Sequence, residues 1–261
     1  MTVALAVTHH DPEGRMLEQI KRVLPVLTGI FGGLAIRASH TAHAPSLALL
    51  TGAGALLAHG SPEQAVERFK LGQARRDALA LALQLDCPFI LYCDCDRALH
   101  WAERYPKELA EVAARVTDFD FTVLGRTPRA LDSHPRIQRD TEAIVNHVFA
   151  SVSGHAWDVT AATRGLARRA AEAVLAGCPD EDVSTDVSWP LFLERAGGFS
   201  LGYMATEGME FETADRYGDE IAQAGGLAPW VARLDADPRN WAHRLDMARV
   251  EIEAMTPYAR G

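Results

Sequence analysis

Several features that would identify other classes of protein are scarce or absent in this chain. Only four of its 261 residues are cysteines, too few for a disulfide framework at this size, so we expect a reducing compartment. The 26 Lys and Arg residues are outnumbered by 35 Asp and Glu, and the formal charge of -9 argues against a general nucleic-acid binder. No apolar stretch reaches the ~20 residues of a membrane-spanning helix, and no basic leader precedes the first strand-like segment. We therefore expect a cytoplasmic protein with no nucleic-acid partner and no integral membrane segment.

Strand-like and helix-like patterns alternate along the first two-thirds of the chain. This alternation is typical of α/β proteins with a largely parallel sheet. The patterns predict strands at 3–7, 33–38, 89–96, 119–124 and 199–204, and helices at 15–27, 61–83, 106–116, 140–153, 162–176 and 187–196. Residues 42–60 give no clear assignment, and residues 125–139 suggest a polar loop. From residue 227 onward the pattern is helical and amphipathic.

The most informative segment is an apolar run, too short for a helix, that ends in Asp94 and Asp96. Side chains alternate along a strand, so we expect both carboxylates on one side, at the point where the strand ends. Paired carboxylates suit a hard divalent cation such as Mg²⁺ or Mn²⁺, which keeps part of its shell for substrate phosphates. The alternative is that this Asp-x-Asp tripeptide only caps the next helix. The same alternation turns Cys93 and Cys95 to the opposite face, where we expect apolar packing rather than a zinc site.

Four segments, in this order, resemble those of nucleotide-sugar glycosyltransferases of the GT-A type (family 2-like). The first is a strand that leads into a polar turn at Thr8, and the second is Ala74-Arg75-Arg76-Asp77, which precedes the Asp-x-Asp strand. The third is the stretch of small residues at 158–165, which contains Arg164. The fourth is an acidic segment at 184–187, followed by a helix that ends at 194–197 and by a late strand. The resemblance covers roughly residues 1–215. It implies a GT-A-like catalytic domain there, a mainly parallel sheet flanked by helices, a nucleotide-sugar donor and a divalent metal cofactor. Residues 216–261 would then be a C-terminal helical appendage, which suits either closure of the acceptor site or a homodimer contact.

The resemblance also implies roles for individual acidic residues in metal binding. Asp96 is the more direct metal ligand, and Asp94 binds metal and also contacts the ribose or sugar. A third ligand would come from late in the chain, where Glu210, Glu212 and His243 are candidates. For each of these three, a solvated surface position is the competing interpretation.

The turn after the first strand is the predicted nucleotide-binding segment. It lies at the carboxyl end of a strand, where open α/β sheets bind ligands. Thr8 and Asp11 carry groups that can hydrogen-bond a base or ribose, and His9 or His10 can stack on a base. The competing interpretation of Asp11 is that it caps the following helix.

Arg75, Arg76 and Asp186 complete the predicted site. The two arginines precede the metal strand and reach the nucleotide in this interpretation; otherwise they form a basic helix face. Asp186 stands where the resemblance places the base of an inverting transferase, which takes a proton from the acceptor hydroxyl. Asp182 is the second choice. A retaining enzyme needs no base there, and Asp186 would then be an N-cap of the helix that begins near residue 187.

The leading hypothesis is a metal-dependent glycosyltransferase of the hexosyltransferase type, which moves a sugar from a nucleotide sugar to an unidentified acceptor hydroxyl. A sugar nucleotidyltransferase is the first alternative. Those enzymes usually carry a glycine-rich loop after the first strand, whereas residues 8–14 contain one glycine. The second alternative is a non-catalytic nucleotide-binding module on the same fold, with Asp94 and Asp96 as remnants.

Overall fold

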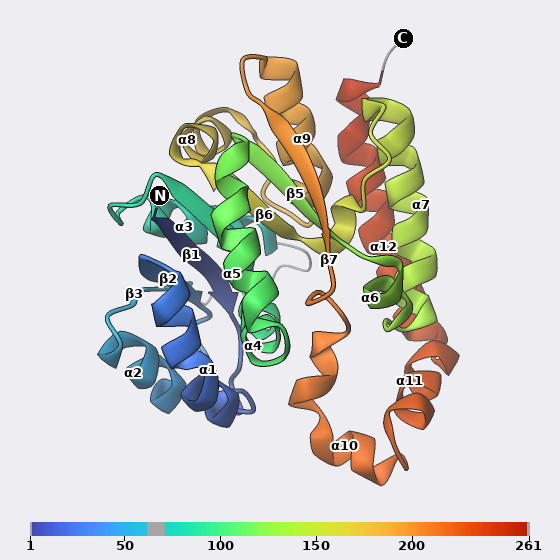
Figure 1. Ribbon diagram of the computed structural model, residues 1–261. Coiled ribbons are helices and arrows are strands. Elements are labelled where there is room, and N and C mark those ends of the chain that lie inside the picture. Colours follow the sequence, from blue (N-terminus) through green and yellow to red (C-terminus); the bar gives the residue numbers. More distant parts are fainter. Residues whose placement is uncertain (1, 62–70, 260–261) are drawn as a thin grey trace.

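A mixed sheet of seven strands runs through the part of the chain that the structure describes (Figure 1). The computed structural model describes residues 2–61 and 71–259. The strands are β1 (Val3–His9), β2 (Gly33–Ala38), β3 (Leu56–His59), β4 (Phe89–Asp94), β5 (Phe121–Arg126), β6 (Thr163–Ala167) and β7 (Leu201–Thr206). Their spatial order is β3-β2-β1-β4-β6-β5-β7. Only β6 runs against its neighbours, antiparallel to β4 and β5, so the predicted mainly parallel sheet is confirmed.

Strand β1 shows why the sheet is covered on both faces. Its residues Val3, Leu5 and Val7 belong to one apolar cluster, and Ala4 and Ala6 belong to the other. Such an uninterrupted apolar run is typical of a parallel strand buried on both sides. The odd residues are large and the even ones are small, so the helix on the alanine side approaches the sheet closely.

Helices cover each face of the sheet. The side of Val3 is covered by α1 (Leu17–Ile30), α2 (Ala44–Gly52), α4 (Cys95–Arg104) and α5 (Pro106–Arg115). The opposite side is covered by α3 (Leu71–Ala82), α7 (Arg136–Ser153), α8 (Arg168–Gly177), α9 (Thr185–Ala196) and α12 (Pro238–Met255). The shorter elements are α6 (Pro128–Asp132), α10 (Gly218–Gln223), α11 (Leu227–Ala236), η2 (Val116–Asp118), η3 (Val159–Ala161), η4 (Glu212–Arg216) and η5 (Thr256–Tyr258).

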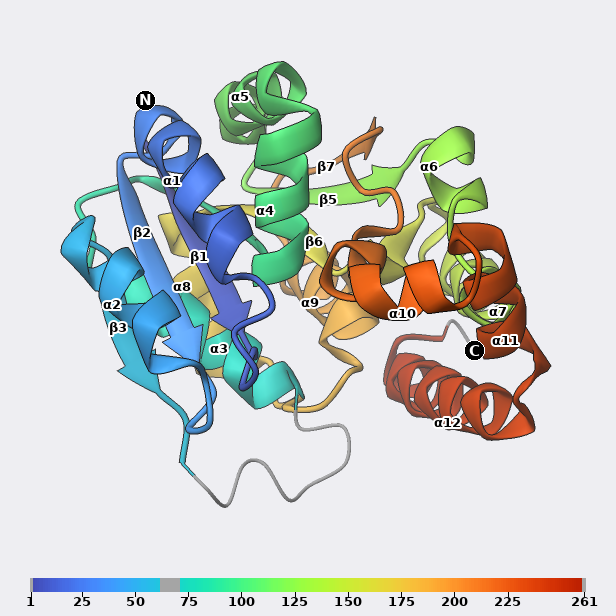
Figure 2. The same ribbon diagram turned by 90° about the horizontal axis from the view of Figure 1, so that it is seen from below.

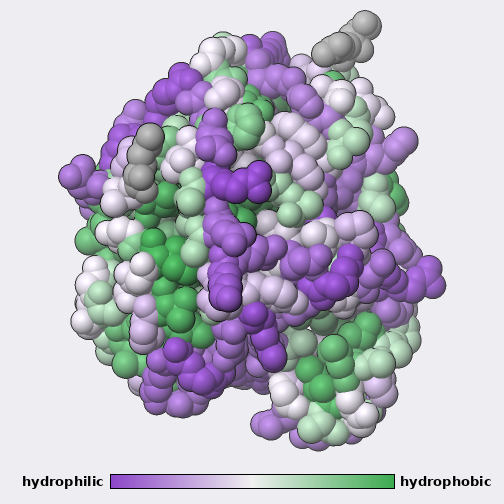
Figure 3. Space-filling view, in the orientation of Figure 1, coloured by the Kyte–Doolittle hydropathy of each residue, from purple (hydrophilic) through white to green (hydrophobic). Residues whose placement is uncertain are grey.

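The C-terminal region is helical, as expected. Helices α10 and α11 have no buried residue and project below the sheet, whereas α12 turns back and lies along α7 (Figures 1 and 2). Apolar surface gathers over α10 and α11 at the lower right of the space-filling view (Figure 3), where the Leu227 side chain is 46% exposed. Helix α12 therefore belongs to the wall of the main domain, and the domain boundary at residue 215 stays a prediction.

Several local predictions were wrong. Residues 163–167, predicted as the start of a helix, form β6 because they pair with β4 and β5, and only α8 is helical. The polar loop predicted at 125–139 was wrong in part, since it contains the end of β5, helix α6 and the start of α7. Residues 42–60, for which the sequence patterns give no clear assignment, contain α2 and β3. The helix predicted at 61–83 is confirmed from Leu71 to Ala82, while its residues 62–70 lie outside the described residues.

Among the described residues, no helix has both the length and the apolar character that crossing a membrane requires.

Candidate active site

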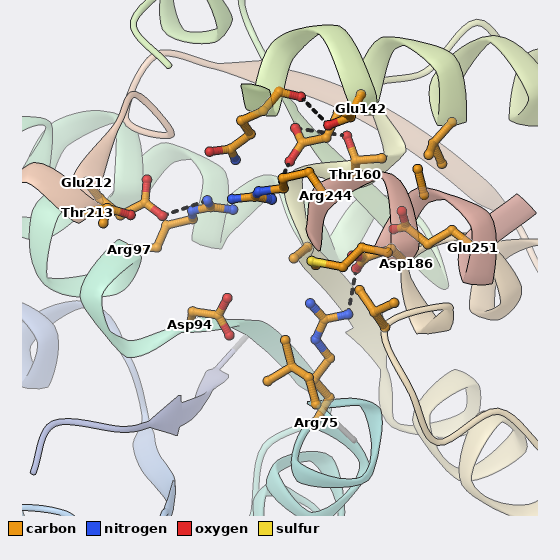
Figure 4. Close-up of a pocket in the computed structure, with 18 of the residues that line it drawn as sticks. Arg75, Asp94, Arg97, Glu142, Thr160, Asp186, Glu212, Thr213, Arg244 and Glu251 are labelled. Carbon is orange, nitrogen blue, oxygen red and sulfur yellow. Dashed lines mark hydrogen bonds and ion pairs between the residues drawn. The ribbon is translucent and has the colours of Figure 1, made fainter. Parts of the chain in front are cut away.

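A cavity of about 230 Å³ lies between the end of β4 and helices α3, α7, α9 and α12 (Figure 4). This is below the ~300 Å³ at which pockets for drug-sized ligands begin, so the enclosed space holds only part of a larger ligand. Within the described residues, three arginines and six acidic residues line it, namely Arg75, Arg97, Arg244, Asp94, Asp96, Glu142, Asp186, Glu212 and Glu251. The cavity is therefore strongly polar and acidic.

The two aspartates of the Asp-x-Asp segment both line this cavity, although not for the predicted reason. Strand β4 ends at Asp94, and helix α4 begins at Cys95, so strand alternation does not extend to Asp96. Asp96 instead lies in the first turn of α4, where its Oδ1 accepts a hydrogen bond from the backbone N–H of Arg97 at 3.0 Å. Cys93 and Cys95 are buried in the apolar cluster between the sheet and α4, which confirms their packing role.

Asp94 is held in place by two hydroxyl groups. The Thr8 hydroxyl donates to Oδ1 of Asp94 at 2.6 Å, and the Tyr92 hydroxyl donates to the same oxygen at 3.2 Å. Asp94 lines the cavity, and within the described residues both bonds go to Oδ1, while its other carboxylate oxygen, Oδ2, accepts no hydrogen bond. Thr8 therefore orients Asp94, and direct contact between Thr8 and a nucleotide stays a prediction.

Asp96 and Glu212 concentrate negative charge beside Asp94. Burial and then repulsion by Glu212 raise the pKa of Asp96 to about 6, while Arg216 opposes the rise with Nη1 at 3.5 Å from Oδ2. Burial also disfavours the charge of Glu212, but Arg97, at 2.7 Å from Oε1, together with His134 and a backbone hydrogen bond, lowers the pKa of Glu212. Among the described residues, Oε2 of Glu212 is buried and has no hydrogen-bond partner.

These groups fit a divalent cation that shares its coordination with a ligand. Within the described residues, no three His, Cys, Asp or Glu side chains converge so as to hold a metal ion by themselves. Asp94 and Asp96 would supply two positions, and phosphate oxygens and water the others, as is usual for Mg²⁺. The excess charge at Asp96 and the unpartnered oxygen of Glu212 are the features that a cation would compensate.

Of the candidates for a third ligand, only Glu212 lines the cavity. The Glu210 carboxylate is used elsewhere, since Arg129 donates to it at 2.6 Å and His100 lies 3.2 Å away. His243 is on α12 but is not among the residues that line the cavity.

Asp186 lies in the cavity wall in the first turn of α9. Its Oδ1 accepts a hydrogen bond from Arg75 at 2.8 Å and lies 3.6 Å from Arg164. Burial raises the pKa of Asp186 although both arginines oppose the rise. Ser184, not Asp186, occupies the N-cap position of this helix, so the capping interpretation of Asp186 was wrong. Asp182 accepts from the backbone N–H of Ser184 at 2.8 Å and does not line the cavity.

The other residues predicted to bind the donor do not line this cavity. Asp11 accepts from the backbone N–H groups of Arg15 and Met16 at 2.9 and 2.8 Å, which supports the capping interpretation. Arg76 donates at 2.7 Å to the carbonyls of Leu175 and Cys178, at the end of α8. This geometry favours a structural role for Arg76.

His9 differs from these residues because it keeps free hydrogen-bonding capacity. It is buried at the end of β1, and neither ring nitrogen has a partner among the described residues. Burial lowers the pKa of His9 to about 4, so the ring is neutral near pH 7. The neighbouring His10 is exposed and lies 2.9 Å from the hydroxyl of Ser39.

Sequence reasoning missed the wall that α12 contributes. Arg244, Met247, Ala248 and Glu251 of this helix line the cavity. Their spacing of three and four residues places them on one helix face. The sequence signal that could have found this wall is the charged residue at each end of the face, Arg244 and Glu251. A face that only packs against the core would usually be apolar throughout.

Comparison with known proteins identifies the fold. No protein-family model matches the chain, and no curated protein matches its sequence. The chain is similar in structure to glucosyl-3-phosphoglycerate synthase from Mycobacterium tuberculosis, solved with Mn²⁺, uridine diphosphate and phosphoglyceric acid. The TM-score is 0.51 and the sequence identity is 12%, and the match covers 77% of this chain and 67% of the synthase. A second structure of the M. tuberculosis synthase gives a TM-score of 0.50 at 12% identity, over 87% and 80% of the two chains. The chain has a GT-A fold, as predicted. At this level of identity, the similarity shows the fold alone.

Proposed function

We propose that this protein is a nucleotide-sugar glycosyltransferase that requires Mn²⁺ or Mg²⁺. The observation that carries the proposal is the cavity at the end of β4, which combines Asp94 and Asp96 with Arg75 and Asp186 on a GT-A sheet. The similar synthase of M. tuberculosis, crystallised with Mn²⁺ and uridine diphosphate, supports this choice. A hexosyl group as the transferred sugar is part of the same proposal.

Asp94 and Asp96 would hold the cation, with Glu212 the nearest further carboxylate in the cavity wall. When bound, the cation neutralises the charge that develops on the phosphate leaving group. Thr8 and Tyr92 fix the carboxylate of Asp94 before the ligand arrives, which reduces the cost of ordering the site.

Asp186 is the proposed base of an inverting reaction. Its carboxylate takes the proton of the acceptor hydroxyl while the acceptor oxygen forms a bond to the anomeric carbon. The bond between that carbon and the phosphate oxygen breaks, and its electron pair leaves with the nucleoside diphosphate. The raised pKa of Asp186 suits a base, and Arg75 holds it in position. In a retaining enzyme, Asp186 would only anchor Arg75 and Arg164.

The nucleotide is placed beside the carboxyl end of β1 in this proposal. His9 has the stronger case for base or ribose contact, because its ring nitrogens lack partners within the described residues. Contacts from Thr8 and Asp11 stay part of the proposal, although their side chains already bond to Asp94 and to the backbone of α1.

Turnover of nucleotide sugars tests this function. The protein would be incubated with UDP-, GDP- and ADP-glucose, each with Mn²⁺, with Mg²⁺ and with EDTA, and release of nucleoside diphosphate would be measured. We expect release from one donor class, dependent on metal and lost in Asp96→Asn, but retained when the exposed Asp118 is changed to Asn. The absence of release from every donor would reject the glycosyltransferase.

Incubation with nucleoside triphosphates and sugar phosphates, and nucleotide binding measured without turnover, separate the alternatives. A sugar nucleotidyltransferase would instead release pyrophosphate from a nucleoside triphosphate and a sugar phosphate. A non-catalytic module would bind nucleotide without turnover.

A homodimer is the remaining proposal about partners. Leu227 and Leu245 lie on the C-terminal helices and are 46% and 48% exposed. Sedimentation velocity tests this, with a monomer at all concentrations as the contradicting result.

A further inference from the structure

Helix α12 places one carboxyl group, that of Glu251, in the cavity wall opposite the predicted metal site (Figure 4). Glu251 is 5% exposed and lies on the buried face of the helix with Ala248 and Met255. Within residues 2–61 and 71–259, no hydrogen bond or ion pair joins its side chain, and its carboxyl group is not among the fully enclosed polar groups but lines the cavity. A buried carboxyl group without a partner is costly to folding, and such groups gather at functional sites.

The arginines around the cavity are already paired. Arg75 lies 2.8 Å from Asp186, Arg97 lies 2.7 Å from Glu212, and Arg244 lies 3.4 Å from Glu142. The two arginines behind them are also paired, since Arg126 lies 2.7 Å from Glu142 and Arg164 lies 3.6 Å from Asp186. In the described part of the chain, each guanidinium of the cavity thus has an acidic partner, whereas Glu251 has no basic one.

We propose that Glu251 is part of the acceptor site, and that the acceptor presents a hydroxyl or ammonium group to α12 rather than a carboxylate or phosphate. This inference rests on the proposed function and specifies its substrate class. A hydroxyl group bonds to Glu251 in either protonation state, because it both donates and accepts. Burial, and then repulsion by Asp186 and Glu142, raise the pKa of Glu251 well above its ordinary value. A hydroxyl or ammonium donor would stabilise the carboxylate form.

A carboxylate or phosphate group of the acceptor would be repelled at this wall. Each described arginine of the cavity already shares its charge with a carboxylate, so an anion would compete with that carboxylate for it. It would also approach Glu142, Asp186 and Glu251, and like charges brought together at an interface are strongly unfavourable. The lining therefore selects against acceptors that present a negative charge to α12.

A series of three-carbon compounds of different charge tests the inference. Glycerol is neutral, glycerate is anionic, and 2-amino-1,3-propanediol is cationic. Each would be titrated into the enzyme with Mn²⁺ and the donor that it hydrolyses, and the change in donor consumption would be recorded. We expect glycerol and the amino-diol to increase donor consumption at concentrations at least roughly tenfold lower than glycerate does.

Two matched variants on α12 make the test specific. Glu251→Gln keeps the size of the side chain and should abolish the advantage of the amino-diol over glycerate. Glu253→Gln changes an exposed carboxylate paired with Arg249 and should behave as the unmodified protein. A lower melting temperature of Glu251→Gln would not by itself change the order of the three probes, so that order separates recognition from a structural role.

The outcomes are distinguishable. Metal-dependent hydrolysis of a donor in water alone supports the donor site of the proposed function, and the probes then decide the inference. Glycerate as effective as glycerol, no effect of any probe, or an unchanged order in Glu251→Gln would overturn the inference. Absence of hydrolysis with every nucleotide sugar would overturn the proposed function and the inference together.

Discussion

The Thr8 hydroxyl donates a hydrogen bond of 2.6 Å to Oδ1 of Asp94 and so joins the end of β1 to the end of β4. Because β1 and β4 are adjacent parallel strands, Thr8 and Asp94 face each other in register. One side chain near the end of β1 thus positions the carboxylate that the metal proposal requires.

Replacement of Thr8 by Val should weaken metal-dependent nucleotide binding. The change removes the hydroxyl that orients Asp94 while keeping the shape, and loss of such a supporting bond typically costs about 10- to 100-fold in affinity. Isothermal titration calorimetry with Mn²⁺ and nucleotide measures the effect. Thr28→Val, which removes a hydroxyl bonded to a carbonyl on the exposed face of α1, is the control. Equal affinities for the two variants would contradict the role of Thr8.

Asp186→Asn should reduce kcat by about 10²- to 10⁴-fold, the usual range for loss of a general base. Nucleotide binding should persist, because Asp186 faces the acceptor in this proposal. Asp182→Asn should retain the normal rate, since Asp182 lies outside the cavity. Nuclear magnetic resonance of the product should show inversion at the anomeric carbon. Retention of configuration, or an unchanged kcat, would exclude Asp186 as the base.

Protonation of His9 should destabilise the protein in mild acid. Burial lowers the pKa of His9 to about 4, from 6.5 in the unfolded chain. Below pH 6.5 the unfolded state therefore binds the proton more readily, and stability is lost as the pH falls from 6.5 to 4. The full loss from this group is about 3 kcal/mol.

Urea unfolding at several pH values measures that loss. His9→Gln should flatten the dependence in this range, whereas His40→Gln, at an exposed position, should leave it unchanged. A His9→Gln protein with the same pH dependence as the unmodified chain would show that folding does not lower the pKa of His9.

Arg76→Gln should reduce stability without reducing nucleotide affinity. Arg76 donates to carbonyl groups at the end of α8, and bonds from a charged donor of this kind contribute roughly 1.5–3 kcal/mol each. Thermal unfolding and nucleotide titration of the same sample separate the two effects. A loss of nucleotide affinity with an unchanged melting temperature would show that Arg76 binds the nucleotide instead of stabilising the fold.

The sequence predicted the parallel half of the fold well, because its signals there are local. The apolar run from Val3 to Val7 and the segment from Gly33 to Ala38 need only their own side chains to indicate buried strands. The segment Thr163–Ala167 was mistaken for helix because alanine, leucine and arginine favour helices, whereas its pairing with β4 and β5 makes it a strand. Propensity was overridden by contacts with strands far away in the sequence.

The candidate site was predicted only in part for the same reason. Asp94, Asp96, Arg75 and Asp186 do meet in one cavity, as the resemblance implied. The ion pairs that fix their charges, and the wall from α12, depend on contacts between segments more than 100 residues apart, such as Arg75 with Asp186. Glu251 could not be assigned to the cavity without the packing of α12 on α7 and α9.

Nucleotide binding measured with and without metal tests the proposed metal site at the end of β4 most directly. Thermal shift of the purified protein would be recorded against UDP, GDP, ADP and CMP, each with Mn²⁺ and with EDTA, for the unmodified chain and for Asp96→Asn. We expect stabilisation by one nucleotide only when Mn²⁺ is present, and its loss in Asp96→Asn. No stabilisation by any nucleotide, or the same stabilisation in EDTA and in Asp96→Asn, would contradict a metal-dependent nucleotide site at the end of β4.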